Sequence, residues 1–259
     1  LINVFGKPIL FWLLDNLKFS NQIDFIYIPY NIELERYRFE DRIRQEYPHF
    51  KFKFFKLKNN TRGAAETVKI SLDNLDGIKD QPIISMDGDN FYSYDIINNW
   101  CGKNLIYSFN DNNSEPIYSY VKLDEFQNIT DIKEKIKISD YACTGAYGFN
   151  SWKDLLENCN EIIEKKILKK NEFYLSTVIK NMINKNVKFI TKTVRKEQYF
   201  CLGTPIQVRI FCENNYQLCE KKRYCFDLDN TLITFSKKHN DYSTVEPIQK
   251  NIDFVKKLK

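Results

Sequence analysis

The sequence predicts an α/β protein with a mainly parallel sheet, followed by a second, incomplete α/β unit. The chain has 259 residues, of which 43% are hydrophobic, and its 20 Phe and 16 Tyr supply ample apolar area for a packed core. Short apolar runs rich in β-formers alternate with longer segments of helical pattern, which is typical of β-α-β units with helices on both faces of a sheet. A polar stretch at residues 213–222 then separates a last strand and helix from the rest.

Helices and strands alternate through the first third of the chain. Pro8 suits the first position of a helix, where the N–H that proline lacks would have no partner anyway. The predicted elements are, in order, a helix at 8–17, a strand at 23–28, a helix at 33–46, a strand at 50–57, a helix at 64–75 and a strand at 82–86. The last of these is a short apolar run of the kind found in buried parallel strands.

The middle of the chain continues this pattern with one difference. The predicted elements are strands at 105–109 and 117–123, helices at 152–168 and 173–184, a strand at 187–191 and a helix from Pro205. The first two strands are joined by the turn-rich residues 110–115, so we expect them to be antiparallel neighbours.

The end of the chain forms a second unit. Residues 223–226 predict a strand that leads into Asp227-Leu228-Asp229-Asn230-Thr231, and residues 247–257 predict a helix. We therefore predict a first domain at 1–218 and a second at 219–259. The second has only about 40 residues, too few for an independent α/β domain.

Charge and composition exclude several classes of function. The net charge of +5 comes from 39 basic and 34 acidic residues that are interspersed, and no segment interleaves basic with aromatic residues as a nucleic-acid groove would. No apolar run approaches the ~20 residues that span a bilayer. The seven cysteines show no CxxC spacing, and only two histidines are present, which predicts free thiols in a reducing cytoplasm. A mildly basic chain suits an enzyme that acts on small phosphorylated molecules.

An acidic motif follows the predicted strand at 82–86. Asp87-Gly88-Asp89-Asn90 stands at the carboxyl end of this strand, where open α/β sheets place their ligands. Two carboxylates separated by a glycine are a plausible Mg²⁺ site, because this ion binds one or two carboxylates together with phosphate oxygens. The structural alternative is an Asp-rich turn.

Six short motifs follow one another along the chain: Asn3-Val4-Phe5-Gly6-Lys7-Pro8-Ile9, Thr61-Arg62-Gly63-Ala64-Ala65-Glu66-Thr67, Gly88-Asp89-Asn90, Ile132-Lys133-Glu134-Lys135, Thr144-Gly145-Ala146-Tyr147 with Glu172-Phe173-Tyr174, and Gly203-Thr204-Pro205. In sequence and in order they resemble motifs of the sugar-phosphate nucleotidyltransferases, which include nucleotide-sugar pyrophosphorylases. The resemblance covers about residues 1–215. It implies a Rossmann-like (GT-A-like) domain that transfers a nucleotidyl group from an NTP to a sugar 1-phosphate or a similar small phosphate, with Mg²⁺ as cofactor.

The resemblance also implies a role for individual residues. Asp89 would hold Mg²⁺ against the α-phosphate, with Asp87 as an outer neighbour. Lys135 would fix and neutralise the acceptor phosphate, and Glu134 would accept a hydrogen bond from a sugar hydroxyl. The structural alternative for the last two is a surface pair.

Further residues would surround the substrates. Thr61 and Gly63 belong to the loop that would contact the nucleotide, and Gly145 and Glu172 to the pocket for the sugar phosphate. For Gly63 the alternative is a simple turn before a helix.

Two departures from the family pattern stand out. The family's glycine-rich loop, which cradles the triphosphate, and its first strand would precede Leu1. Many relatives carry an Asp two residues before the glycine of the closing Gly-Thr-Pro turn, as a second metal ligand, and here Cys201 takes that place. A thiol is a poor ligand for Mg²⁺. The resemblance then implies one of two arrangements. Either one protein carboxylate and the phosphates hold the metal, or another residue takes the place of the missing Asp.

The C-terminal unit resembles the start of a haloacid-dehalogenase-type phosphatase. Asp227-Leu228-Asp229-Asn230-Thr231 matches the first motif of that family, which implies Asp227 as nucleophile and Asp229 as general acid and base. Residues 241–245 and the helix after Pro247 are similar to members from capsule biosynthesis. The later motifs of that family would lie beyond Lys259.

Two alternative functions remain open. A glycosyltransferase could use Asp87-Gly88-Asp89 as a DxD motif, although this would not explain the other motifs together. A degenerate, non-catalytic binding domain is the second alternative, favoured by Cys201. The sugar, the base and the oligomeric state are not determined by the sequence.

Overall fold

The computed structural model describes residues 2–17, 23–75, 77–219, 224–239 and 241–258. The chain forms two compact units, Leu1–Asn214 and Asn215–Lys259, which we call unit 1 and unit 2. In the described part of the chain, no helix has the length and apolar character that a bilayer crossing requires.

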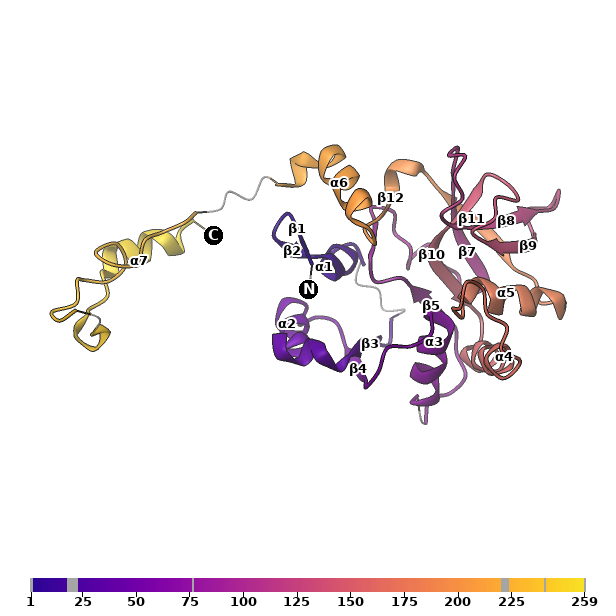
Figure 1. The fold of residues 1–259 in the computed structure, drawn as a ribbon, viewed down its shortest axis with the longest axis horizontal. Helices are drawn as coiled ribbons and strands as arrows, with labels where there is room; N and C mark the ends of the chain where they lie inside the picture. Colours follow the sequence, from indigo (N-terminus) through magenta and orange to yellow (C-terminus); the bar gives the residue numbers. More distant parts are fainter. Residues whose placement is uncertain (1, 18–22, 76, 220–223, 240, 259) are drawn as a thin grey trace. The chain divides into compact units, whose positions relative to one another are not determined.

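Unit 1 is built around a six-stranded mixed sheet (Figure 1). Its strands are β5 (Ile83–Met86), β7 (Leu105–Asn110), β8 (Ser119–Leu123), β9 (Ile129–Glu134), β10 (Tyr141–Phe149) and β11 (Ile190–Val194). The order is β11-β7-β10-β8-β9, and β5 also pairs with β10. β10 is therefore the central strand: β7 occupies one of its edges, and β8 and β5 share the other.

The α/β class is confirmed, but the sheet is mixed rather than mainly parallel. β10 runs antiparallel to β5, β7 and β8, and β8 runs antiparallel to β9, whereas β7 and β11 are parallel. The expected pairing of the strands at 105–109 and 117–123 is also wrong, because β10 lies between them. β10 is buried along almost its whole length, so its small and aromatic side chains fit the centre of a sheet covered on both faces.

Each face of the sheet packs against its own apolar cluster. On one face lie α3 (Ala64–Asp73), α4 (Trp152–Glu164) and α5 (Leu175–Asn184), which contact one another (Figure 1). Their core includes Leu72, Leu155, Ile162, Val178 and Phe189. The other face packs against an aromatic cluster that includes Tyr92, Tyr107, Phe109, Tyr120 and Tyr199.

The N-terminal part of unit 1 has its own small sheet. Strands β3 (Ile26–Asn31) and β4 (Phe52–Leu57) pair in parallel, and α1 (Ile9–Leu14), the 3₁₀ helix η1 (Ile32–Tyr37) and α2 (Phe39–Glu46) accompany them. The first helix begins one residue later than predicted. Pro8 ends β2 (Lys7–Pro8), which pairs with β1 (Asn3–Val4), and serves as the residue before the helix.

A third pair of strands connects the acidic motif to the end of unit 1. β6 (Asn90–Tyr92) and β12 (Tyr199–Cys201) pair antiparallel, with Cys201 opposite Asn90. The short 3₁₀ helix η2 (Lys196–Gln198) precedes β12, and α6 (Pro205–Asn214) follows it. This pairing brings two distant parts of the sequence together.

Unit 2 contains little regular structure among its described residues. It has 3₁₀ helices η3 (Tyr216–Cys219) and η4 (Tyr242–Thr244) and one helix, α7 (Gln249–Lys256). The strand predicted at 223–226 is not formed over the described residues 224–226, and Arg223 lies outside them. None of the described residues of unit 2 is fully buried. The described part of unit 2 offers no neighbouring strand to satisfy the backbone of residues 224–226 or to cover their side chains, and isolated strands are not stable.

Candidate active site

The acidic loop between β5 and β6 is anchored to the central strand by a buried asparagine. Asn90 is 2% exposed, and its side-chain amide donates a hydrogen bond of 2.8 Å to the carbonyl of Thr144 in β10. The hydroxyl of Tyr92 donates to the same carbonyl at 2.6 Å. The backbone N–H of Asp87 donates to the carbonyl of Gly145 at 3.0 Å. These bonds hold residues 87–90 against β10.

Both carboxylates of this loop lie against glycine backbones. A Cβ on Gly145 would stand 2.3 Å from Oδ2 of Asp87, and a Cβ on Gly203 would stand 2.4 Å from Oδ2 of Asp89. Gly145 also has a φ of +80°, which side-chain-bearing residues rarely adopt. A side chain at either glycine would displace the carboxylate beside it, so the two carboxylates occupy space that these glycines leave open.

The negative charges of Asp87 and Asp89 repel each other. Asp87 is open to solvent, yet the protein surrounding it disfavours its charged form, and the charges of Asp89 and Glu134 add to this effect. Together they raise the pKa of Asp87 to about 7. Burial also raises the pKa of Asp89. Among the described residues, no cationic side chain pairs with either carboxylate, which makes the loop a site that favours a bound cation.

Cys201 lies beside Asp89. The N–H of Leu202 donates to the carbonyl of Asp89 at 2.7 Å, and the sulfur of Cys201 lies 3.6 Å from the position of a Cβ on Gly203. Burial, with smaller effects from Asp89 and Asp87, raises the pKa of the thiol. The structure thus places Cys201 next to the predicted metal ligand.

Glu134 stands at the end of β9 and is held by two serines. The hydroxyls of Ser119 and Ser176 both donate to its Oε2, the second at 2.7 Å. Its other oxygen, Oε1, accepts neither of these bonds. Nothing in the sequence indicated these serines, because they come from a neighbouring strand and from α5.

Lys135 and Glu172 meet at one tyrosine. The ammonium of Lys135 lies 3.3 Å from the hydroxyl of Tyr174, and this hydrogen bond raises the pKa of the lysine. Burial raises the pKa of Tyr174, and a hydrogen bond with Glu172 adds to this. Within the described part of the chain, Lys135 forms no ion pair with a carboxylate. Its charge is therefore available to an anion.

The loop with Thr61 and Gly63 packs against the same segment. The N–H of Phe173 donates to the carbonyl of Arg62 at 2.7 Å, and the N–H of Ala65 donates to the carbonyl of Phe173 at 2.9 Å. Gly63 has a φ of +124°, and a Cβ there would stand 2.6 Å from the carbonyl oxygen of Phe173. Thr61 shares a hydrogen bond of 2.6 Å with Thr67 at the start of α3. The loop is therefore fixed beside residues 172–174.

The predicted residues of unit 1 thus form two connected groups. The first group is the acidic loop with its neighbours, and its members are Asp87, Asp89, Gly145 and Cys201. The second group lies around residues 173 and 174, and its members are Thr61, Gly63, Lys135 and Glu172. Glu134 links the groups, because it neighbours Lys135 in sequence and influences Asp87 electrostatically.

The two predicted phosphatase residues belong to unit 2. Asp227 is exposed and its carboxylate accepts a hydrogen bond of 2.9 Å from the N–H of Leu228. Asp229 accepts a hydrogen bond of 3.1 Å from the hydroxyl of Tyr242, and its Oδ1 is buried without a partner.

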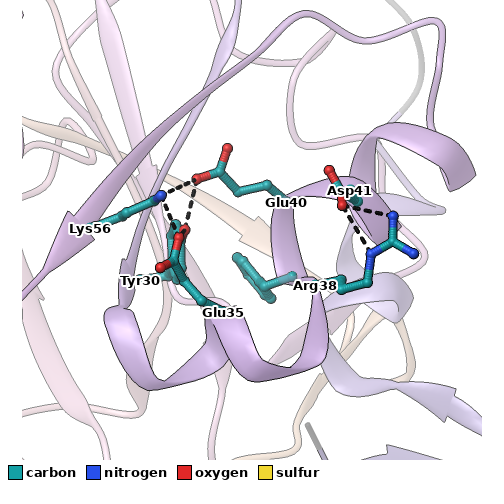
Figure 2. Close-up of a pocket in the computed structure, with 7 residues that line it drawn as sticks. Tyr30, Glu35, Arg38, Glu40, Asp41 and Lys56 are labelled. Carbon is teal, nitrogen blue, oxygen red and sulfur yellow. Dashed lines mark hydrogen bonds and ion pairs between the residues drawn. The ribbon is translucent and has the colours of Figure 1, made fainter.

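A separate pocket of about 250 Å³ lies among β3, η1, α2 and β4 (Figure 2). Its charged groups pair with one another: Lys56 with Glu35 and Glu40, and Arg38 with Asp41. None of the predicted site residues lines it. Because each of its charged groups is already engaged in an ion pair, it offers no evident chemistry.

Several solved structures share this fold, although no protein-family model and no curated protein matches the sequence. A nucleoside-diphosphate-sugar pyrophosphorylase from Vibrio cholerae RC9 matches with a TM-score of 0.70 at 20% identity, over 82% of this chain and 90% of that one. An inositol-1-phosphate CTP transferase from T. maritima matches with a TM-score of 0.65 at 11% identity, over 86% and 88%.

The CTP:phosphocholine cytidylyltransferase from Streptococcus pneumoniae matches with a TM-score of 0.61 at 13% identity, over 83% of this chain and 88% of that one. At these identities the likeness establishes the fold. The chain therefore has the Rossmann-like α/β fold of these nucleotidyltransferases.

Proposed function

We propose that this chain transfers a nucleotidyl group from an NTP to a sugar 1-phosphate or a similar small phosphate, and releases pyrophosphate. One observation carries the proposal. The loop at Gly63, the acidic loop at Asp89 and the ammonium of Lys135, which pairs with no carboxylate among the described residues, are held together in a single unit that has the nucleotidyltransferase fold. The names of the similar structures support an acceptor that carries a phosphate.

The proposed reaction is an in-line displacement at phosphorus. An oxygen of the acceptor phosphate attacks the α-phosphorus, the bond to the oxygen that bridges the α- and β-phosphates breaks, and pyrophosphate leaves with that oxygen. No covalent bond to the protein is needed, so positioning and charge neutralisation supply the catalysis. Lys135 would bind the acceptor phosphate, and Oε1 of Glu134 would accept a hydrogen bond from an acceptor hydroxyl.

The acidic loop fits the magnesium ion that this reaction implies. Two carboxylates without a cationic partner, each set against a glycine, offer the oxygen donors that Mg²⁺ prefers. No group of three or more His, Cys, Asp or Glu side chains in the described residues is placed to hold a metal, so phosphate oxygens would complete the coordination. The bound ion would neutralise charge on the phosphates. Asp89 is the ligand that we assign first.

The cellular role that we propose is the synthesis of capsule or surface polysaccharide in the cytoplasm. It rests on the resemblance of residues 227–231 to the start of a capsule-type phosphatase domain, with Asp227 and Asp229 in the positions of nucleophile and general acid. Cys101, Cys143, Cys159, Cys201 and Cys225 are free thiols, as a reducing compartment favours.

The product of turnover tests this function against its alternatives. The purified protein is incubated with Mg²⁺, each of the four NTPs and a panel of sugar 1-phosphates and phosphocholine, and pyrophosphate is measured. We expect pyrophosphate and a nucleotide conjugate with at least one pair. Release of a nucleoside diphosphate from a nucleotide sugar would identify a glycosyltransferase instead. Nucleotide binding without any turnover would identify a non-catalytic binding domain.

A further inference from the structure

We propose that Asp87, and not Cys201, is the second protein ligand of the divalent cation held by Asp89. This inference rests on the proposed function, because nucleotidyl transfer is what implies the cation. It concerns a position where the chain departs from the family pattern that it resembles. The structure supports both parts of this proposal, that Asp87 is a ligand and that Cys201 is not.

The first reason is the placement of Asp87. Its backbone N–H donates to the carbonyl of Gly145 in β10, so its side chain leaves an anchored position directly after β5. The carboxylate lies over the Cα of Gly145, where any side chain would displace it, and it is open to solvent. Asp89 is placed in the same manner against Gly203. Both groups are thus fixed and accessible on the loop of residues 87–89 between β5 and β6.

The second reason is the lack of any internal partner for these charges. Within the described residues, the side chains of Asp87 and Asp89 form no ion pair. Glu134, the third carboxylate that acts on Asp87, is occupied on one oxygen by Ser119 and Ser176. The ammonium of Lys135 is directed to Tyr174. A divalent cation between Asp87 and Asp89 would supply the missing positive charge, as bound cations do at such sites.

The third reason concerns Cys201 itself. Its side chain packs against the aromatic cluster that contains Tyr92 and Tyr199, so it belongs to the apolar core as much as to the site. A thiol in such surroundings is inert, and Mg²⁺ selects oxygen over sulfur. Cys201 therefore fills space beside Asp89 and leaves the coordination to Asp87.

Metal binding without turnover tests the assignment. Mn²⁺ is titrated into the protein, and free Mn²⁺ is measured by electron paramagnetic resonance. We expect Asp87→Asn and Asp89→Asn each to weaken binding at least about tenfold, as loss of one of two carboxylate ligands should. Cys201→Ser should change the affinity by less than about twofold, as should Asp140→Asn, which alters an exposed carboxylate elsewhere.

Cobalt gives an independent readout of the sulfur. A thiolate bound to Co²⁺ produces a strong near-ultraviolet charge-transfer band, and we expect none in the native protein. A band that Cys201→Ser abolishes would overturn the proposal. So would unchanged Mn²⁺ affinity in Asp87→Asn that retains the native circular dichroism spectrum. Asp87→Glu, which keeps the carboxylate, should retain more affinity than Asp87→Asn.

These outcomes are separate from those of the proposed function. A protein that releases pyrophosphate while its Mn²⁺ affinity is unaffected by Asp87→Asn retains its function and refutes the assignment. A protein that binds Mn²⁺ through Asp87 but transfers no nucleotide retains the metal site and refutes the function.

Discussion

At the scale of single residues, the site depends on backbone positions that only glycine can occupy. Gly63 and Gly145 both have positive φ and both touch another part of unit 1. At Gly63 the neighbour is the backbone of Phe173, which cannot move aside as a flexible side chain could. At position 63, the positive φ and the contact with the backbone of Phe173 therefore both disfavour any residue other than glycine.

Gly63→Ala should lower the free energy of unfolding by about 2–3 kcal/mol, since it adds backbone strain and a collision with the backbone of Phe173. Urea denaturation followed by circular dichroism measures the change. Gly77→Ala is the matched control, because Gly77 also has positive φ but nothing lies within 4 Å of the added methyl. It should cost only about 1 kcal/mol. Equal effects of the two substitutions would show that contact with Phe173 is unimportant.

Lys135→Met should lower kcat/KM at least about tenfold and raise the KM for the acceptor phosphate, while the KM for the NTP changes little. The reason is the loss of a charge-assisted hydrogen bond to the acceptor. Steady-state kinetics with varied acceptor measures it. Lys133→Met, at an exposed position of β9 two residues earlier, is the control and should leave both constants unchanged. A rise in the KM for the NTP alone would place Lys135 on the nucleotide instead.

At the scale of elements, a charged contact joins α4 to α5 and its loop. Glu161 of α4 pairs with Lys165 at 2.5 Å just after α4 and with Lys185 at 2.5 Å just after α5. It also accepts a hydrogen bond of 2.8 Å from Asn181. These partners, Lys165 first, lower the pKa of Glu161 from 4.5 to about 2. The contact fixes α5, which also carries Ser176.

Because this pKa is lower in the folded protein than in the unfolded chain, the contact stabilises the fold fully above about pH 4.5. The stabilisation is lost as the pH falls from 4.5 towards 2. Glu161→Gln should therefore lower the melting temperature at pH 6 and lose less stability than the native protein between pH 6 and pH 3. Thermal melts by circular dichroism measure this difference. Glu164→Gln, an exposed position of the same helix, should reproduce the native pH dependence.

At the scale of the whole molecule, the two units differ in how much they bury. Unit 1 has a sheet covered on both faces, whereas none of the described residues of unit 2 is fully buried. Apolar side chains of unit 2, including Leu228, Phe235 and Phe254, are more than half exposed. Unit 2 therefore has little to hold a catalytic carboxylate in place.

The 259-residue chain should not hydrolyse p-nitrophenyl phosphate in the presence of Mg²⁺. Forming an aspartyl phosphate needs a nucleophile fixed on a complete sheet and cations that offset the phosphoryl charge. Asp227 lies instead on an exposed segment without a strand. Release of p-nitrophenol measures the activity, and a C-terminally extended chain provides the comparison. Hydrolysis that Asp227→Asn abolishes would show that unit 2 already forms a working site.

The sequence alone determined the features that depend on local pattern. Runs of β-formers and helical periods gave the α/β class and most element positions to within a few residues, because these signals are local. The Asp87–Asp89 motif was found from its position after a predicted strand, and the loop at Gly63 from its resemblance to a family motif.

Tertiary structure alone decided which strands pair. The sequence of β10 mixes small, polar and aromatic residues without a strand period, so it was missed, yet burial on both faces makes it the central strand. The segment at 224–226 has a strand-like sequence, but among the residues that the structure describes no strand pairs with it and it does not form one. Glu134 with Ser119 and Ser176, and Cys201 beside Asp89, come together only through sheet register and helix packing. Such contacts depend on the burial of surfaces distant in sequence, which no local pattern records.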